Sequence, residues 1–111
     1  MDLHEEQVDE VTALSVKGRI DSTTAPAFGQ RLESVVTAPA GRLVVDFRDL
    51  EYISSAGFRV LLVAAKRADE AGSRLVLCGL SGKVRQLFDL GGFLDLFTIA
   101  ASRDDAMTAA R

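Results

Sequence analysis

The sequence predicts a single α/β domain in which helices pack against a mostly parallel sheet. Two short apolar runs at 43–47 and 75–78 are rich in branched residues and have the composition of buried strands. Between them, residues 58–71 contain no proline and are rich in Ala, Leu, Lys, Arg and Glu, which favours a helix. A strand–helix–strand crossover of this kind predicts that the two strands are parallel and joined by a right-handed connection.

Length and composition fit one domain over residues 1–111. Apolar residues make up 48% and charged residues 26% of the chain, as in globular rather than disordered or membrane proteins. The net charge is −3 and no basic stripe is visible, which argues against a nucleic-acid partner. The longest apolar run, 60–65, is too short to cross a bilayer, so we expect no membrane insertion. The single cysteine, Cys78, fits a reducing cytoplasm, and its apolar neighbours predict a buried structural thiol.

The N-terminal third predicts a pair of strands followed by a helix. Rough alternation over 11–16 indicates a strand that pairs with a segment near 3–8 across a turn at residues 9–10. The sequence Ser-Thr-Thr-Ala-Pro at 22–26 is typical of a helix start, because proline is tolerated in the first turn. Four apolar residues of this helix share one face and are expected in the core: Phe28, Leu32, Val35 and Val36.

The remainder of the chain predicts one long helix and several shorter elements. We expect a connection at 48–53, a helix at 56–71 and a left-handed C-cap at Gly72. The long helix should expose Arg59, Lys66 and Glu70 and bury Phe58, Leu61, Leu62, Ala65 and Ala68. Further on, the pattern indicates a helix at 82–90 capped by Ser81, a short strand at 96–99 and a terminal helix capped by Ser102.

Two serines, Ser54 and Ser55, lie where the strand region gives way to the long helix. A serine at a helix start can cap the helix through its side-chain oxygen, and we expect Ser55 to do so when unmodified. The same position favours an anion, because free backbone amides and the helix dipole point at it. Small neighbours, Ala56 and Gly57, should leave those amides accessible. The residues alone favour a plain cap over a serine that carries phosphate.

Catalytic and metal-binding patterns are weak, so we expect no enzyme, no cofactor and no metal. The only histidine, His4, lies in a polar stretch with nothing to hold it as a base for a serine nucleophile. Metal ligands of the Cys and His type are not clustered. The acids Asp46, Asp49 and Glu51 follow a strand and could bind magnesium, but solvated loop acids are the more common explanation.

Four segments, taken in order, resemble the STAS domain, and within that family the stand-alone anti-sigma factor antagonists. They are Gly18–Asp21, Leu43–Phe47, Ile53–Leu62 and Leu75–Leu80, followed by a helix that ends in Leu-Gly-Gly-Phe at 90–93. The resemblance covers residues 5–108. It implies an STAS-like α/β fold with a mostly parallel four- to five-stranded sheet and helices packed mainly on one face.

The resemblance also implies a regulatory switch in place of an enzyme. In its unphosphorylated form, such a domain sequesters a serine-kinase anti-sigma factor and frees the sigma factor. The kinase phosphorylates a serine to end the binding, and a PP2C-type phosphatase restores it. The alternative within the family is a constitutive adaptor, of a lipid-transport ATPase or a stressosome-type scaffold, that uses the same surface without phosphorylation.

Residue by residue, the family's Asp-Ser-Ser-Gly form places the phosphoacceptor at Ser55. Ser54 takes the aspartate position and is the second candidate, because two neighbouring hydroxyls lie where the family has one acceptor. Ala56 replaces the second serine, and Gly57 matches the glycine. The resemblance implies that Asp21 matches an acid near the acceptor. The residues expected to bind the partner are Asp21, Ser22, Thr23, Ser54, Ala56, Gly57 and Arg59.

Overall fold

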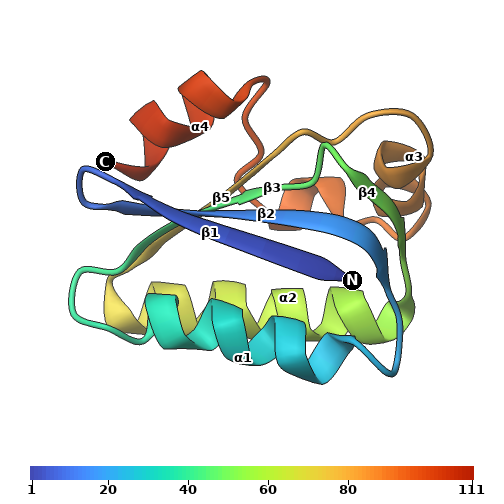
Figure 1. Ribbon diagram of the computed structural model, residues 1–111, viewed down its shortest axis with the longest axis horizontal. Coiled ribbons are helices and arrows are strands. Elements are labelled where there is room, and N and C mark those ends of the chain that lie inside the picture. Colours follow the sequence, from blue (N-terminus) through green and yellow to red (C-terminus); the bar gives the residue numbers. More distant parts are fainter.

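The computed structural model describes all residues, 1–111, as a five-stranded sheet with helices on both faces (Figure 1). In chain order the elements are β1 (Asp2–Val8), β2 (Val11–Ile20), α1 (Ala25–Val36), β3 (Arg42–Asp46), β4 (Leu50–Ile53), α2 (Ser55–Ala71), β5 (Arg74–Cys78), α3 (Gly82–Leu90), the 3-10 turn η1 (Leu94–Leu96) and α4 (Arg103–Ala110). None of the helices combines the length and the apolar character needed to span a membrane.

The sheet is mostly parallel, as the sequence predicts. Its strands run in the order β1-β2-β3-β5, with β1 antiparallel to β2 and the pairs β2–β3 and β3–β5 parallel. The turn between β1 and β2 places Asp9 at a φ of 56°. Strand β4 lies off this path and pairs in parallel with the C-terminal end of β2, where the register shifts between Gly18 and Arg19. The end of β2 therefore belongs to a second, smaller ladder.

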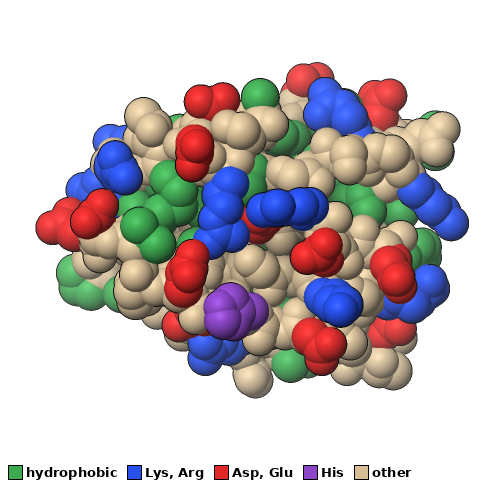
Figure 2. Space-filling model, turned by 45° about the horizontal axis from the view of Figure 1, so that its top comes forward, with side chains coloured by type: hydrophobic (Ala, Val, Ile, Leu, Met, Phe, Trp, Pro, Cys, Tyr) green, Lys and Arg blue, Asp and Glu red, His purple; other side chains and the backbone are tan.

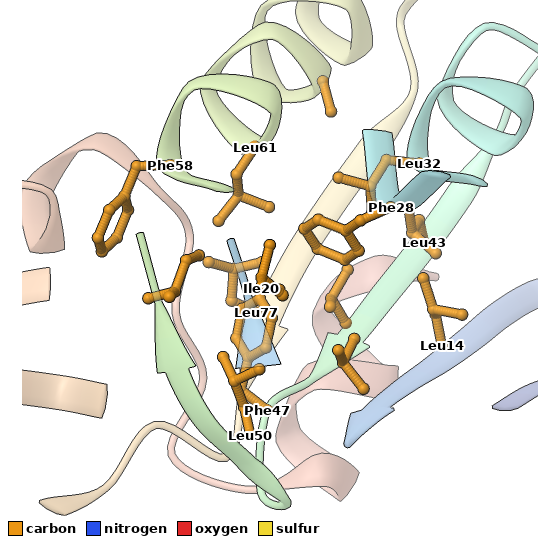
Figure 3. Packing of buried hydrophobic residues seen from close by; sticks show 14 of the residues in the cluster. Leu14, Ile20, Phe28, Leu32, Leu43, Phe47, Leu50, Phe58, Leu61 and Leu77 are labelled. Atoms are coloured by element: carbon orange, nitrogen blue, oxygen red, sulfur yellow. The ribbon is translucent and has the colours of Figure 1, made fainter. Parts of the chain in front are cut away.

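The main core lies between the sheet and the two long helices, α1 and α2, which run side by side under the sheet in Figure 1. Alternate residues of β2, β3 and β5 point to this face, as period-2 strands require. Figure 3 shows how side chains of α1, α2 and the strands meet there. The fully buried residues at the centre of this layer include Leu14, Phe28, Leu32, Leu43, Leu61 and Leu77.

Helix α4 alone covers the opposite face of the sheet (Figure 1). Its small residues allow a close approach to the strands. This second cluster consists of Val11, Ala13, Val44, Val76, Cys78, Ala106, Met107 and Ala110. Cys78 is fully buried, as the sequence predicts, and burial raises the pKa of its thiol to about 11. The expectation that the helices pack mainly on one face is thus confirmed.

Two expected elements differ from the structure. The segment 48–53, expected as a connection, contains strand β4; its four residues bury only Leu50 and Ile53, too few to produce a strand pattern in the sequence. The strand expected at 96–99 is wrong: η1 occupies 94–96, and only Ile99 forms a bridge, to Leu77. Aromatic packing accounts for this, because the turn lets both Phe93 and Phe97 contact the phenylalanines of the core.

Asp46 joins helix α4 to the end of β3 from inside the fold. Its side chain is 4% exposed and accepts hydrogen bonds from the backbone N–H of Arg48 at 3.0 Å and from Nη1 of Arg103 at 3.2 Å. Burial on its own raises the pKa of Asp46, but the hydrogen bonds from Arg48 and Arg103 outweigh it, and the pKa lies below its usual value. Arg103 also reaches Glu6 on β1, at 2.8 Å.

We expect the change Asp46→Asn to lower the free energy of unfolding at pH 7 by about 1–3 kcal/mol, because two arginines lose a charged acceptor. The pKa of Asp46 is lower in the folded protein than the value of 3.8 expected for the unfolded chain. The stabilisation by the Asp46 carboxylate is therefore complete above pH 3.8 and is lost as the pH falls through the folded-state pKa. Urea unfolding of both proteins at a series of pH values measures it. A difference between the two proteins that stays constant from pH 7 to below pH 3.8 contradicts this account.

Candidate functional site

The ends of β2 and β4 bring two distant segments of the chain together. Ile20 pairs with Ile53, and the N–H of Ser54 donates to the carbonyl oxygen of Ile20 at 2.9 Å. From these ends the chain enters α1 through residues 21–24 and α2 through Ser54, at the same edge of the domain (Figure 1). The carboxyl ends of parallel strands form the usual binding edge of an α/β sheet. Because β4 aligns with β2, the residues after each strand lie side by side.

Ser54, and not Ser55, is the residue that caps α2. Its backbone is extended, with φ −88° and ψ 174°, and its Oγ accepts the N–H of Gly57 at 3.4 Å. Its carbonyl oxygen accepts the N–H of Phe58 at 3.0 Å, the first turn of the helix. The expectation that Ser55 caps the helix is therefore wrong. The helix begins at Ser55, one residue earlier than that expectation requires, because the extended β4 ends immediately before Ser54.

Ser55 is the first residue of α2 and its side chain is exposed. Its hydroxyl forms no hydrogen bond with another protein group, in contrast to the hydroxyl of Ser54. The first N–H groups of a helix have no intrahelical acceptor, and the helix dipole places partial positive charge at this end. Ser55 thus presents a free hydroxyl beside groups that stabilise negative charge.

Gly57 is required because the helix packs tightly against both strand ends. A Cβ at this position would lie 2.6 Å from Cγ1 of Ile53 and 2.8 Å from Cγ2 of Ile20. We expected Gly57 to leave the backbone amides open, but the structure places it in the core. On the other side of the turn, Phe58 is 6% exposed and stacks on Phe93 with ring centroids 4.3 Å apart. The first turn of α2 is therefore held from both sides.

Asp21 organises the neighbouring loop through hydrogen bonds with Thr23 and Thr24. Its Oδ1 accepts from the N–H of Thr23 at 3.0 Å, from the hydroxyl of Thr23 at 2.6 Å and from the N–H of Thr24 at 3.2 Å. The bond from the Thr23 hydroxyl is the main reason that the pKa of Asp21 lies below its usual value. Ser22 and Thr23 are exposed. The loop therefore carries a fixed negative charge and presents two hydroxyl residues to solvent.

Two arginines border the site. Arg59 is exposed on α2, one turn after Ser55, at a shallow groove between α1 and α2. Arg19 lies over the ring of Tyr52, with its guanidinium carbon 4.4 Å from the ring centroid. This second pair was not foreseen from the sequence, because it depends on the alignment of β4 with β2. The structure places all of the expected partner-binding residues around the two junctions: Asp21, Ser22, Thr23, Ser54, Ala56, Gly57 and Arg59.

The three acids in and after the strand run of 43–47, Asp46, Asp49 and Glu51, do not converge on one point. Asp46 is bound by arginines, whereas Asp49 and Glu51 are exposed, and no group of three or more His, Cys, Asp or Glu side chains converges. On the face that Figure 2 shows, acidic and basic side chains are interspersed and form no extended patch of one sign. The β2–α1 and β4–α2 junctions are thus the best-defined candidate site.

Known proteins resemble this chain over nearly its whole length. The STAS domain family model matches residues 3–106. BtrV of Bordetella bronchiseptica, which carries the name of an anti-sigma factor antagonist, is 37% identical over 109 residues, covering 98% of this chain and 94% of BtrV. The anti-sigma-B factor antagonist of Listeria monocytogenes is 31% identical over 99 residues, covering 89% and 86% of the two chains.

A solved structure gives the same result. An anti-sigma factor antagonist from Mycobacterium paratuberculosis has a TM-score of 0.84 and 29% identity, covering 99% of this chain and 93% of its own. The likeness therefore includes both junctions that form the candidate site.

The two serines should differ in their effect on stability. We expect Ser54→Ala to lower the free energy of unfolding by about 0.5–1 kcal/mol, since the cap is lost. Ser55→Ala should change it by less than about 0.5 kcal/mol, because no contact is lost. Chemical denaturation of the two variants measures the difference. A larger loss for Ser55→Ala than for Ser54→Ala would show that the cap is assigned to the wrong serine.

Gly57→Ala should be more costly than either serine change. The added methyl group overlaps Ile53 and Ile20, and overpacking of this kind costs about 1–3 kcal/mol. Ser55→Ala, two residues earlier in the same turn, is the matched control. A Gly57→Ala protein as stable as the wild type in the same denaturation experiment would mean that the close approach of α2 to the strands is not a constraint.

Proposed function

The chain belongs to the STAS domain family, and we propose that it is an anti-sigma factor antagonist switched off by phosphorylation of Ser55. Unmodified, it binds a serine-kinase anti-sigma factor in the cytoplasm and so frees the sigma factor. The kinase phosphorylates Ser55, and a PP2C-type phosphatase reverses the modification. The names of relatives that are 37% and 31% identical support the antagonist role.

The exposed, unbonded hydroxyl of Ser55 at the start of α2 is the observation that carries the proposal. A kinase can reach it without disturbing the helix, whereas the oxygen of Ser54 holds the cap and is half-buried. Phosphate adds a charge of about −1.5 to −2 at neutral pH. Free amides and the helix dipole favour that charge at Ser55, so the fold has no reason to change.

The negative charge of a phosphate on Ser55 weakens the binding of a partner. The proposed interface is formed around Ser55 by Asp21, Ser22, Thr23, Ser54, Ala56 and Arg59, whereas Gly57, which was expected to belong to it, is buried beneath this surface. A partner that buries the neutral hydroxyl has to desolvate a dianion after phosphorylation, next to the ionised Asp21. A buried charge without a partner costs about 3–5 kcal/mol. Since every 1.4 kcal/mol is about tenfold in affinity, binding should weaken at least a hundredfold.

A binding role is favoured over an enzymatic one at this site. A serine nucleophile needs an adjacent base held by a further group. The Ser55 hydroxyl has no hydrogen bond to a histidine or carboxylate, and His4, the only histidine, is on the exposed strand β1. The hydroxyl is therefore better suited to receive a phosphate from a kinase than to attack a substrate.

Phosphosite mapping after incubation with the cognate kinase and ATP tests the proposal. We expect one phosphate, on Ser55, in the wild type and in Ser54→Ala, and none in Ser55→Ala. Phosphate retained in Ser55→Ala would move the acceptor to Ser54. A wild type that takes up no phosphate would contradict the switch and favour the constitutive adaptor.

A further inference from the structure

Arg59 is placed to contact a phosphate on Ser55 from within the same helix. The two residues are four apart on α2, and residues at this spacing lie on one face with Cβ atoms about 5–6 Å apart. Side chains of a helix lean toward its N-terminus, so a long side chain covers the turn before its own Cα. An Arg59 side chain in such a rotamer reaches the turn that begins at Ser55.

Arg59 is also free to take up a new partner. It forms none of the ion pairs in the structure, and Glu33, which lines the same groove, is paired with Arg67 at 3.0 Å. Among the other charged groups near the two junctions, Arg19 is stacked on Tyr52, and Asp21 and Glu51 are anionic. Arg59 is thus the cation on α2 that a phosphate on Ser55 would meet first.

We propose that Arg59 binds the phosphate of phosphorylated Ser55 and holds it against the first turn of α2. This inference takes from the proposed function only that Ser55 is the modified residue. Charge-assisted hydrogen bonds between guanidinium and phosphate are among the stronger polar contacts in proteins. The free N–H groups at the start of the helix bind other oxygens of the same phosphate.

The contact changes what phosphorylation does to the docking surface. In the unmodified protein, Arg59 is an exposed cation available to a partner. After phosphorylation the same cation is engaged by the phosphate. The modification therefore adds negative charge at Ser55 and at the same time withdraws a positive group one turn along the helix. Both effects act against a partner that binds the unmodified surface.

Phosphoserine built into position 55 during synthesis tests this contact without any kinase. A ³¹P NMR titration gives the second pKa of the phosphate, about 6 in the absence of interactions. In the otherwise wild-type protein we expect the pKa of this phosphate to lie below that value, because Arg59 favours the dianion. In Arg59→Gln we expect the phosphate pKa to be higher by roughly half a unit, which is about a threefold change in proton affinity. The Nε–H signal of Arg59 should also shift when Ser55 is phosphorylated.

Lys66→Gln is the matched control, because it removes the same charge from the same face of α2. Lys66 lies eleven residues after Ser55, about 16 Å along the helix, beyond the screening length of about 10 Å at 0.1 M salt. We expect no shift in this variant.

Equal pKa values in wild type and Arg59→Gln, or equal shifts in the Arg59 and Lys66 variants, would overturn the contact. Failure of a kinase to modify Ser55 would contradict the proposed function and not the contact. The titration tests the contact independently of any kinase, because the phosphoserine is incorporated during synthesis.

Discussion

The close packing of α2 against the paired ends of β2 and β4 is the constraint on which the candidate site depends. Ile20 and Ile53 lie opposite each other, and Gly57 fits against both because it has no side chain. The bond from the Ser54 N–H to the Ile20 carbonyl oxygen joins the two segments directly. With these contacts made, Ser54 turns inward as the cap, and Ser55, the next residue, is left exposed.

Contacts on both faces of the sheet hold the elements around Ser55 in place. Phe58 and Phe93 fix one side of the first turn, and Asp46 with Arg103 ties α4 to the opposite face of the sheet. A charge added at Ser55 meets amides and a cation of its own helix, so it acts on a partner and not on the fold. Switching by local electrostatics needs no conformational change in such a domain.

Much of the fold could be predicted because its elements carry strong local signals. Gly72 does end α2 in the left-handed conformation, with φ 69°, and Ser102 does cap α4, at 3.0 Å from the N–H of Asp105. Strand β4 could not be foreseen, because it is only four residues long and is stabilised by pairing with β2. The exchange of roles between Ser54 and Ser55 has the same origin, since the end of β4 decides where the helix begins.

The affinity of the anti-sigma factor kinase for the protein with serine or phosphoserine at position 55 tests the central claim most directly. Calorimetric titration in the same buffer gives both dissociation constants, and thermal unfolding of each form establishes that both are folded. The account predicts binding at least a hundredfold weaker for the phosphorylated form, from the cost of about 3–5 kcal/mol for a buried unpaired charge. Equal dissociation constants for two folded forms would contradict it.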